Sequence, residues 1–489
     1  MKRKNLMLLI CTFVLLYALA LIKADYNNKV VFTGDEWDYQ SIAVNNYYGS
    51  EFLTTGRIKE IETYKLEKLD DGKIQFWENF SGNKAYHRGP FYPAFLCLSY
   101  KVFGINPIVV KYFQLFLIVF SGLLLVFIGK LAWGEKGQYI GYLSSIVFVT
   151  LNYRFSEHLM PENWQFLFLA LITILLFYHY RGSGMHSILL GIMLGFSLLN
   201  KGTTFFLFPI IILIDMFYVS YKNKSHWWNM LLFVISFVFI AGLWSMYVSV
   251  ERNQFTFISA QAGEVLLEGN NEFCSDGLWH PEWRDKPYSS YNTDKMGSLP
   301  SVIRVVNFYL DNPRYLSNFP AKVKTAFAPI YSFIALISLY LILLSFWISS
   351  KSKFITSIVN KWFGFVIAFL LLCFSIFFSL FSATLNTMMF FSIVALMFFL
   401  SILFYKELLK IPIIIPFQFV VIFLNFLIFT LAFYVCNETY LSRYVKTMDG
   451  IFILVCFYLL FEILDNLFKI KSTINEKADS SVKRKNSIY

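Results

Sequence analysis

The chain has 489 residues, of which 57% are hydrophobic and only 15% are charged. Soluble proteins carry about 25% charged residues, so this composition excludes an ordinary soluble protein and predicts a membrane protein with several spans. The net charge of +11 would favour nucleic-acid binding in a soluble protein. Here the basic residues lie mainly in short loops between apolar segments, where they indicate membrane topology, and we expect no nucleic-acid partner.

A helix needs about 17–25 apolar residues to cross a bilayer, and segments of roughly this kind recur along the chain. They lie at about 7–23, 105–129, 138–151, 163–179, 185–199, 203–220, 229–250, 327–349, 362–383, 387–405, 411–435 and 450–468. The sequence therefore predicts an all-α polytopic membrane protein with about twelve transmembrane helices. No small-residue cleavage site precedes Lys23, so we expect the first span to be retained rather than removed as a signal peptide.

Lysine and arginine residues give the orientation, because they concentrate at the N-terminus, in alternate loops and in the tail. By the positive-inside rule this side is cytoplasmic, and both termini are predicted to lie there. Residues 469–489 then form a basic cytoplasmic tail, and two large hydrophilic segments, 24–104 and 251–326, lie outside. The abundance of Phe, Ile, Lys and Asn is typical of an AT-rich genome, and we expect a bacterial inner (plasma) membrane.

An acidic motif, Thr33 to Tyr39, follows the first span directly and contains Asp35 and Glu36. Thr33 and Glu36 fit a capping box, and carboxylates are favoured at the start of a helix, so helix capping is one sufficient explanation of the motif. A carboxylate at the membrane surface can also accept a proton from a substrate. The motif by itself leaves both interpretations open.

The same outer segment contains His87 and Arg88, which precede an apolar, aromatic run ending at Phe103-Gly104. Such a run can lie along the membrane interface instead of crossing it. Arg88 at this depth is suited to bidentate phosphate contact, although a lone interfacial arginine more often extends toward water.

The loop at 152–162 adds Glu157, His158 and Glu162 on the predicted outer side. The order Met160-Pro161-Glu162 predicts a helix start, with proline in the first turn and Glu162 favoured by the helix dipole. Glu157 and His158 fit that explanation less well, and they are candidates to face an aqueous site.

Lys201 lies between two hydrophobic stretches, on the side opposite most lysines, which favours an anionic ligand. Arg443 and Tyr444 form a similar basic segment before the last span. In the second large loop, Asn270 and Asn271 precede several Cys, Asp, His and Glu residues whose irregular spacing predicts no metal site.

Together these segments resemble the GT-C fold, the integral-membrane glycosyltransferases that use polyprenyl-phosphate sugars. Within that fold they are similar to the protein O-mannosyltransferases and the lipid A aminoarabinose transferase. The resemblance covers residues 1–468, and its motifs are Gly34-Asp35-Glu36-x-x-Tyr39, Arg88-x-Pro90, Lys201-Gly202 with Pro209, Gly269-Asn270-Asn271 and Arg443-Tyr444. The chain departs from the pattern in a longer interval between Tyr39 and His87, and in the residue between Arg88 and Pro90.

The resemblance implies an inverting glycosyltransferase that moves a sugar from a polyprenyl-phosphate donor to a lipid, glycan or protein acceptor outside. Asp35 resembles the acidic residue that acts as general base or orients the acceptor, and Glu36 resembles its companion. The cations that resemble donor-phosphate ligands are Arg88, Lys201 and Arg443, and either Glu157 or Glu162 resembles the second acidic residue. The remaining expected substrate or phosphate contacts are Tyr39, His87, His158, Asn270, Asn271 and Tyr444. No metal ligand is predicted and no cofactor is required, although Mg or Mn could assist.

Two other classes compete with this interpretation. A membrane polysaccharide polymerase or ligase would explain the large segment 251–326 but not the Asp35-Glu36 pair. A transporter would be favoured by mid-span charges and repeats, whereas few charges lie in mid-span, Asp215 is near a predicted cytoplasmic end, and no repeat is evident.

Overall fold

The computed structural model describes residues 3–24, 35–47, 53–54, 67–68, 74–75, 83–84, 88–221, 224, 226–259, 266–267, 269–271, 298–317, 319, 322, 416–433, 446–458 and 461–462. Nearly all of them belong to one compact unit, Met1–Val323 with Pro416–Ile453. The second unit is Lys324–Ile415 with Leu454–Tyr489. Several predicted features lie outside the described residues, namely Thr33, His87, Arg443, Tyr444 and the spans at 327–349, 362–383 and 387–405.

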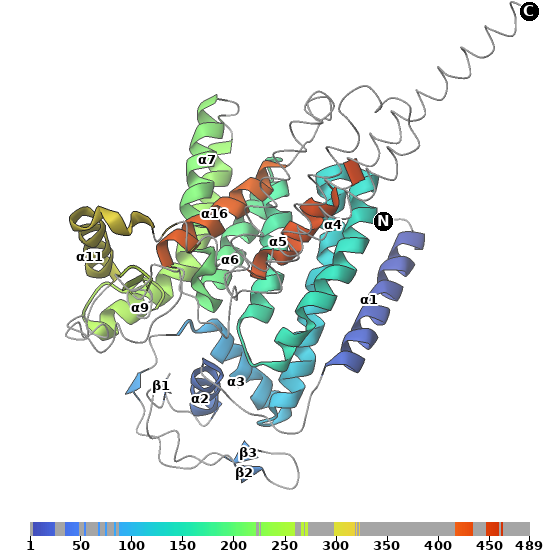
Figure 1. Ribbon diagram of the computed structural model, residues 1–489, viewed down its shortest axis with the longest axis horizontal. Coiled ribbons are helices and arrows are strands. Elements are labelled where there is room, and N and C mark those ends of the chain that lie inside the picture. Colours follow the sequence, from blue (N-terminus) through green and yellow to red (C-terminus); the bar gives the residue numbers. More distant parts are fainter. Residues whose placement is uncertain are drawn as a thin grey trace, which may run out of the picture. The chain divides into compact units, whose positions relative to one another are not determined.

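The described part of the chain is helical, which confirms the all-α class (Figure 1). Its helices are α1 (Arg3–Lys23), α2 (Asp35–Tyr47), α3 (Phe91–Phe103), α4 (Pro107–Asn152), α5 (Glu162–His179), α6 (Gly184–Asn200), α7 (Leu207–Tyr221), α8 (His226–Phe237), α9 (Leu243–Arg252), α11 (Ser298–Asp311) and α16 (Phe417–Phe433). Short 3-10 turns are η2 (Tyr153–Glu157), η3 (Gly202–Thr204), η9 (Pro313–Ser317) and η12 (Lys446–Met448), and η4 (Val238–Gly242) is a π-helical turn. The strands, of two residues each, are β1 (Leu53–Thr54), β2 (Glu67–Lys68), β3 (Ile74–Gln75) and β4 (Asn83–Lys84).

The strands form two small antiparallel pairs within the first large hydrophilic segment. Leu53 lies opposite Lys84 in the β1–β4 pair, and Glu67 lies opposite Gln75 in the β2–β3 pair. Strands this short bury little surface, so the helices determine the fold.

Three helical segments among the described residues are long and apolar enough to cross a membrane, namely Pro107–Glu157, Glu162–His179 and His226–Arg252. Shorter apolar helices include Met7–Lys23, Phe91–Phe103, Gly184–Asn200, Gly202–Phe217, Phe417–Leu431 and Asp449–Tyr458. Most of these helices coincide with predicted spans, and they support association with a membrane. The count of about twelve spans remains a prediction.

The predicted spans 105–129 and 138–151 are the two arms of α4, which turns sharply at Trp133 and Gly134. Gly134 has φ 66° and ψ −145°, a conformation that glycine adopts without the strain of a side chain. A Cβ atom at Gly137 would lie 2.0 Å from the Gly129 carbonyl oxygen. The two arms therefore pack backbone against backbone, which small residues permit.

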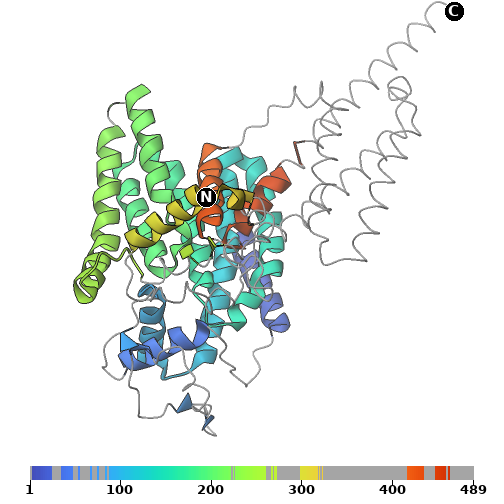
Figure 2. The same ribbon diagram turned by 60° about the vertical axis from the view of Figure 1, so that its left-hand side comes forward.

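Helix α6 packs against α5 on one side and α8 on the other. A Cβ atom at Gly191 would lie 2.4 Å from the Phe233 carbonyl oxygen, so α6 and α8 approach closely there. Helices α2 and α3 pack on each other at one end of the bundle of α4, α5 and α6 (Figures 1 and 2). This end, where α5 begins and α6 ends, carries most of the predicted site residues.

Candidate functional site

Arg88 joins two carboxylates of α2 at this end of the bundle. Asp35 and Asp38 are three positions apart, which places them on one face of the helix. Arg88 donates through Nη2 to Asp35 Oδ1 (2.6 Å) and to Asp38 Oδ2 (2.5 Å), and through Nε to Asp38 Oδ2 (3.0 Å). The Arg88 side chain is 8% exposed and that of Asp35 is 28% exposed, so Asp35 is the more accessible partner.

The local sequence explains how Arg88 reaches this position. A Cβ atom at Gly89 would lie 2.1 Å from the Leu199 carbonyl oxygen, so only glycine lets the chain pass the end of α6 before α3 begins after Pro90. The guanidinium carbon of Arg88 lies 5.3 Å from the centre of the Tyr39 ring, a cation–π contact. The interpretation of Arg88 as a lone interfacial arginine is therefore wrong, because the side chain is buried and paired.

The charge of Arg88 is secured by its surroundings. Burial lowers the pKa of a guanidinium, but Asp35, Tyr39 and Asp38 outweigh this effect and raise the pKa of Arg88 well above its usual value. Arg88 therefore stays protonated at every physiological pH, and it can bind an anion.

Glu36 lies in a different environment from Asp35. It is 2% exposed, its Oε1 is 2.7 Å from His158 Nδ1, and its Oε2 accepts the Leu159 backbone N–H (3.3 Å). The pKa of His158 is raised, chiefly by the hydrogen bond to Glu36, against the opposing effects of burial and of the Lys111 charge. Glu36 and His158 therefore form a pair that ties α2 to the loop between η2 and α5.

Glu162 and Lys201 form a second buried pair, with Nζ 2.6 Å from Oε1. Glu162 begins α5, which confirms the predicted helix start after Pro161. Asn200 at the end of α6 donates to the Pro161 carbonyl oxygen (2.9 Å), which holds the two helix ends together. Of the two candidates for the second acidic residue, Glu162 contacts the predicted cation Lys201, whereas Glu157 interacts electrostatically with Lys111.

Tyr92 connects the two pairs. Its hydroxyl donates to Gln114 Oε1 (2.5 Å), and it interacts electrostatically with both Glu36 and Glu162. Gln114 in turn donates to the His158 carbonyl oxygen (2.8 Å). We call the whole group the carboxylate–cation cluster, and its members are Asp35, Glu36, Asp38, Arg88, Lys111, His158, Glu162 and Lys201.

Three other residues that we predicted to contact the substrate are buried, and two of them contact residues outside the carboxylate–cation cluster. Tyr39 is 5% exposed and packs edge-on against Tyr92, so it supports Arg88 from beneath. Asn270 Oδ1 accepts from Lys322 Nζ (2.7 Å), and Asn271 Nδ2 donates to the Leu267 carbonyl oxygen (3.2 Å). The structure thus joins Asn270 to a buried lysine instead of to the carboxylate–cation cluster.

Sequence reasoning missed Asp38, Lys111 and Lys322. Asp38 carried a usable signal, because a residue three positions after Asp35 falls on the same helical face. Lys111, inside the predicted apolar span 105–129, was a weaker signal, and we find none for Lys322, which is fully buried and donates to the Leu431 carbonyl oxygen (3.0 Å).

The cluster combines a partly exposed carboxylate with a permanently charged arginine, which suits proton acceptance beside a bound anion. Among the described residues, no three side chains of this cluster share one coordination sphere, so Mg or Mn here would need further ligands from a substrate phosphate. No protein-family model matches the chain, and no match is found among curated proteins or solved structures.

Proposed function

We propose that the chain is an inverting glycosyltransferase with a GT-C fold, which moves a sugar from a polyprenyl-phosphate donor to an acceptor at the outer face of the membrane. The observation that supports this most strongly is the arrangement of Asp35, Asp38 and Arg88, in which one arginine is shared by a buried and a partly exposed carboxylate.

Arg88 is the phosphate ligand in this proposal. Asp38 receives two hydrogen bonds from Arg88, through Nε and Nη2, and Asp35 receives one through Nη2. The single bond is the easier one to exchange. A donor phosphate takes the place of Asp35 at the guanidinium, whose planar geometry matches phosphate oxygens, while Asp38 keeps the arginine in position.

Asp35 is the general base. Once the donor phosphate holds Arg88, the Asp35 carboxylate is released toward the acceptor and becomes more basic, because a cation no longer stabilises its charge. The acceptor hydroxyl attacks the anomeric carbon as Asp35 takes its proton, and the bond from that carbon to the phosphate oxygen breaks. A single displacement of this kind inverts the anomeric centre.

Arg88 and Lys201 stabilise the negative charge that develops on the leaving polyprenyl phosphate, a contribution that is usually the largest in such reactions. Glu162 holds the Lys201 ammonium within 2.6 Å, which limits its movement. Glu36 positions α2 against His158 and Leu159. Because it is only 2% exposed, it is not placed to accept the proton of an acceptor, which is the role of Asp35.

The test is sugar transfer from a panel of labelled polyprenyl-phosphate sugars by membranes that contain wild-type protein, Asp35→Asn or Glu135→Gln. Glu135 is the matched control, because its carboxylate is 70% exposed and pairs with Lys130 on a surface turn. We expect Asp35→Asn to lose at least ~100-fold in rate, the typical contribution of a general base. Equal rates for the two variants would remove Asp35 from the mechanism, and no transfer from any donor by wild type would overturn the proposed activity.

A further inference from the structure

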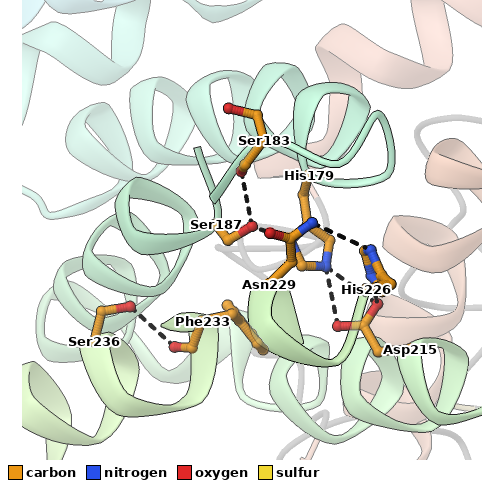
Figure 3. Close-up of polar contacts among 8 residues, drawn as sticks. All are labelled: His179, Ser183, Ser187, Asp215, His226, Asn229, Phe233 and Ser236. Atoms are coloured by element: carbon orange, nitrogen blue, oxygen red, sulfur yellow. Dashed lines mark hydrogen bonds and ion pairs between the residues drawn. The ribbon is translucent and has the colours of Figure 1, made fainter. Parts of the chain in front are cut away.

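A second polar cluster lies at the other end of α5, where His179, Asp215 and His226 meet (Figure 3). His179 ends α5, Asp215 belongs to α7, and His226 begins α8. The Nε2 atom of His179 lies 3.0 Å from Asp215 Oδ2, and that of His226 lies 3.1 Å from Asp215 Oδ1. All three side chains are at most 1% exposed, so three potential ligands are held together away from water.

Ser187 contacts the ring nitrogen of His179 that does not face Asp215. The Ser187 hydroxyl lies 3.0 Å from the Ser183 carbonyl oxygen and 2.8 Å from His179 Nδ1, and it can donate its one proton to either of them. When that proton goes to Ser183, His179 donates Nδ1–H to Ser187 and Nε2 presents a lone pair toward Asp215; when it goes to Nδ1, Nε2–H is donated to Asp215. A lone pair and a carboxylate at 3.0 Å repel each other unless a cation or an additional proton lies between them.

His226 has a corresponding outer partner. Its Nδ1 lies 3.5 Å from the Asn229 side-chain amide, whose oxygen and nitrogen can exchange places by a flip of the amide group. With the amide oxygen toward the ring, Nδ1–H is donated to Asn229, and Nε2 again presents a lone pair toward Asp215. Histidine ligands of metals typically donate their second ring N–H to such a partner, which fixes the tautomer and the ring orientation.

The geometry points to a metal site: we propose that His179, Asp215 and His226 bind one divalent transition-metal ion of the zinc class. The ligand atoms lie within 4.8 Å of one another. In a tetrahedral zinc site with bonds of about 2.0–2.2 Å, neighbouring ligand atoms are about 3.3–3.6 Å apart, so an ion would move the histidine nitrogens slightly away from Asp215, which they now contact at 3.0 and 3.1 Å. Two imidazoles and one carboxylate favour zinc over magnesium or calcium.

The surroundings close this site and favour a structural role for the ion. The Tyr180 ring stacks on His226 at 5.6 Å and 15°, and the two histidine rings meet edge to face at 4.8 Å. An ion here would tie together α5, α7 and α8. Structural zinc sites usually have four ligands from the protein, so an ion held by these three would take a fourth, such as a trapped water; bound in this buried position it would contribute to folding.

This site is independent of the proposed glycosyl transfer. Glu162 and His179 are the two ends of α5, and a helix of 18 residues is about 27 Å long. Arg181, which the topology places in the cytoplasm, follows His179 by two residues, so the site lies on the predicted cytoplasmic side. A variant that loses sugar transfer should therefore still bind zinc, and a variant that loses zinc binding should still transfer sugar.

The test uses the purified full-length chain in detergent, stripped of metal with a chelator and then titrated with Zn²⁺. Elemental analysis gives the ions bound per chain, competition with a chromogenic chelator gives the affinity, and the visible spectrum of the Co²⁺ form reports the coordination. We expect one zinc per wild-type chain and at least tenfold weaker binding for Asp215→Asn and His226→Gln. His186→Gln is the matched control, because His186 lies outside the ligand set and bonds to Ser183.

A further variant, Ser187→Ala, keeps every ligand and removes the Ser187 hydroxyl, which contacts His179 Nδ1 and the Ser183 carbonyl oxygen. Its zinc affinity should fall about 10–100-fold, the usual effect of losing such a partner. Zinc binding by this variant and by the wild type tests the proposed metal site even if the ligand variants fail to fold. The proposal is overturned if the wild type binds no stoichiometric zinc, or if His226→Gln and His186→Gln bind it equally well; the cluster is then a hydrogen-bonded group in which Asp215 accepts from both histidines.

Discussion

The two ends of α5 hold the two polar clusters of the described structure, and they differ in access to solvent. At the Glu162 end, the side chains of Asp35 and His158 are 28% and 53% exposed. At the His179 end, all three polar side chains are at most 1% exposed. Buried polar groups must satisfy one another, whereas partly exposed ones can exchange a partner for a substrate. The first end is therefore suited to chemistry and the second to holding helices together.

The largest effect on stability is expected for Arg88→Ala. This variant tests whether the Glu162 end, although partly exposed, depends on a buried ion pair. Removing one member of a buried pair leaves the other charge uncompensated and costs about 3–5 kcal/mol. Chemical denaturation in detergent measures the loss. The control is Lys130→Ala, which breaks an exposed pair with Glu135 and should change stability by at most about 1 kcal/mol. Equal effects would show that Arg88 is not buried against Asp38 as described.

Two glycines allow each end to be disturbed separately. A Cβ atom would lie 2.1 Å from the Leu199 carbonyl oxygen at Gly89, and 2.1 Å from Ser236 Oγ at Gly191. Gly89→Ala should move Arg88 and reduce sugar transfer, whereas Gly191→Ala should displace α8 and weaken zinc binding.

Each glycine substitution should also destabilise the chain by about 1–3 kcal/mol, as other overpacked sites do. Transfer rate and zinc affinity, measured on both variants, test the independence of the two ends. A loss of both properties in each variant would show that the ends are coupled.

The smallest expected effect concerns pH and the Glu36–His158 pair. The pKa of His158 is raised in the folded chain, chiefly by its hydrogen bond to Glu36. The pair therefore contributes its full stability below the unfolded pKa of about 6.5, and this contribution is lost as pH rises through the higher folded pKa. Because half of the His158 side chain is exposed, the change should stay below about 1 kcal/mol.

Denaturation of wild type and His158→Gln between pH 5 and pH 9 measures this effect. The variant should lack the fall in stability with rising pH that we expect of the wild type above a pH of about 6.5. Parallel curves for the two proteins would show that Glu36 and His158 are not coupled.

The elements that depend on nearby residues were predictable. Glu162 begins a helix because proline and an acidic side chain in the first turn favour that start, and Lys201 stood out against the charge pattern of the loops. The all-α class followed from the long apolar segments. The hairpin of α4 did not, because its two arms read as separate spans and the turn at Gly134 depends on how they pack.

The contacts between distant residues were not predictable. Asp38 and Arg88 are 50 positions apart, and the partners of Asp215 lie on two other helices. A single histidine at a helix end has no local pattern that distinguishes a ligand from a capping or packing residue. Such clusters exist only once the helices are packed, and one sequence carries no information on which ends meet.

The most direct test of the central proposal compares binding and transfer in Asp35→Asn. If Asp35 competes with the donor phosphate for Arg88, the variant should bind polyprenyl phosphate as tightly as wild type or more tightly, while sugar transfer falls at least ~100-fold. Titration with labelled polyprenyl phosphate and single-turnover transfer measure the two quantities on the same preparation. Unchanged transfer, or binding and transfer lost together, would contradict the assignment of Asp35 as the base beside an arginine-bound phosphate.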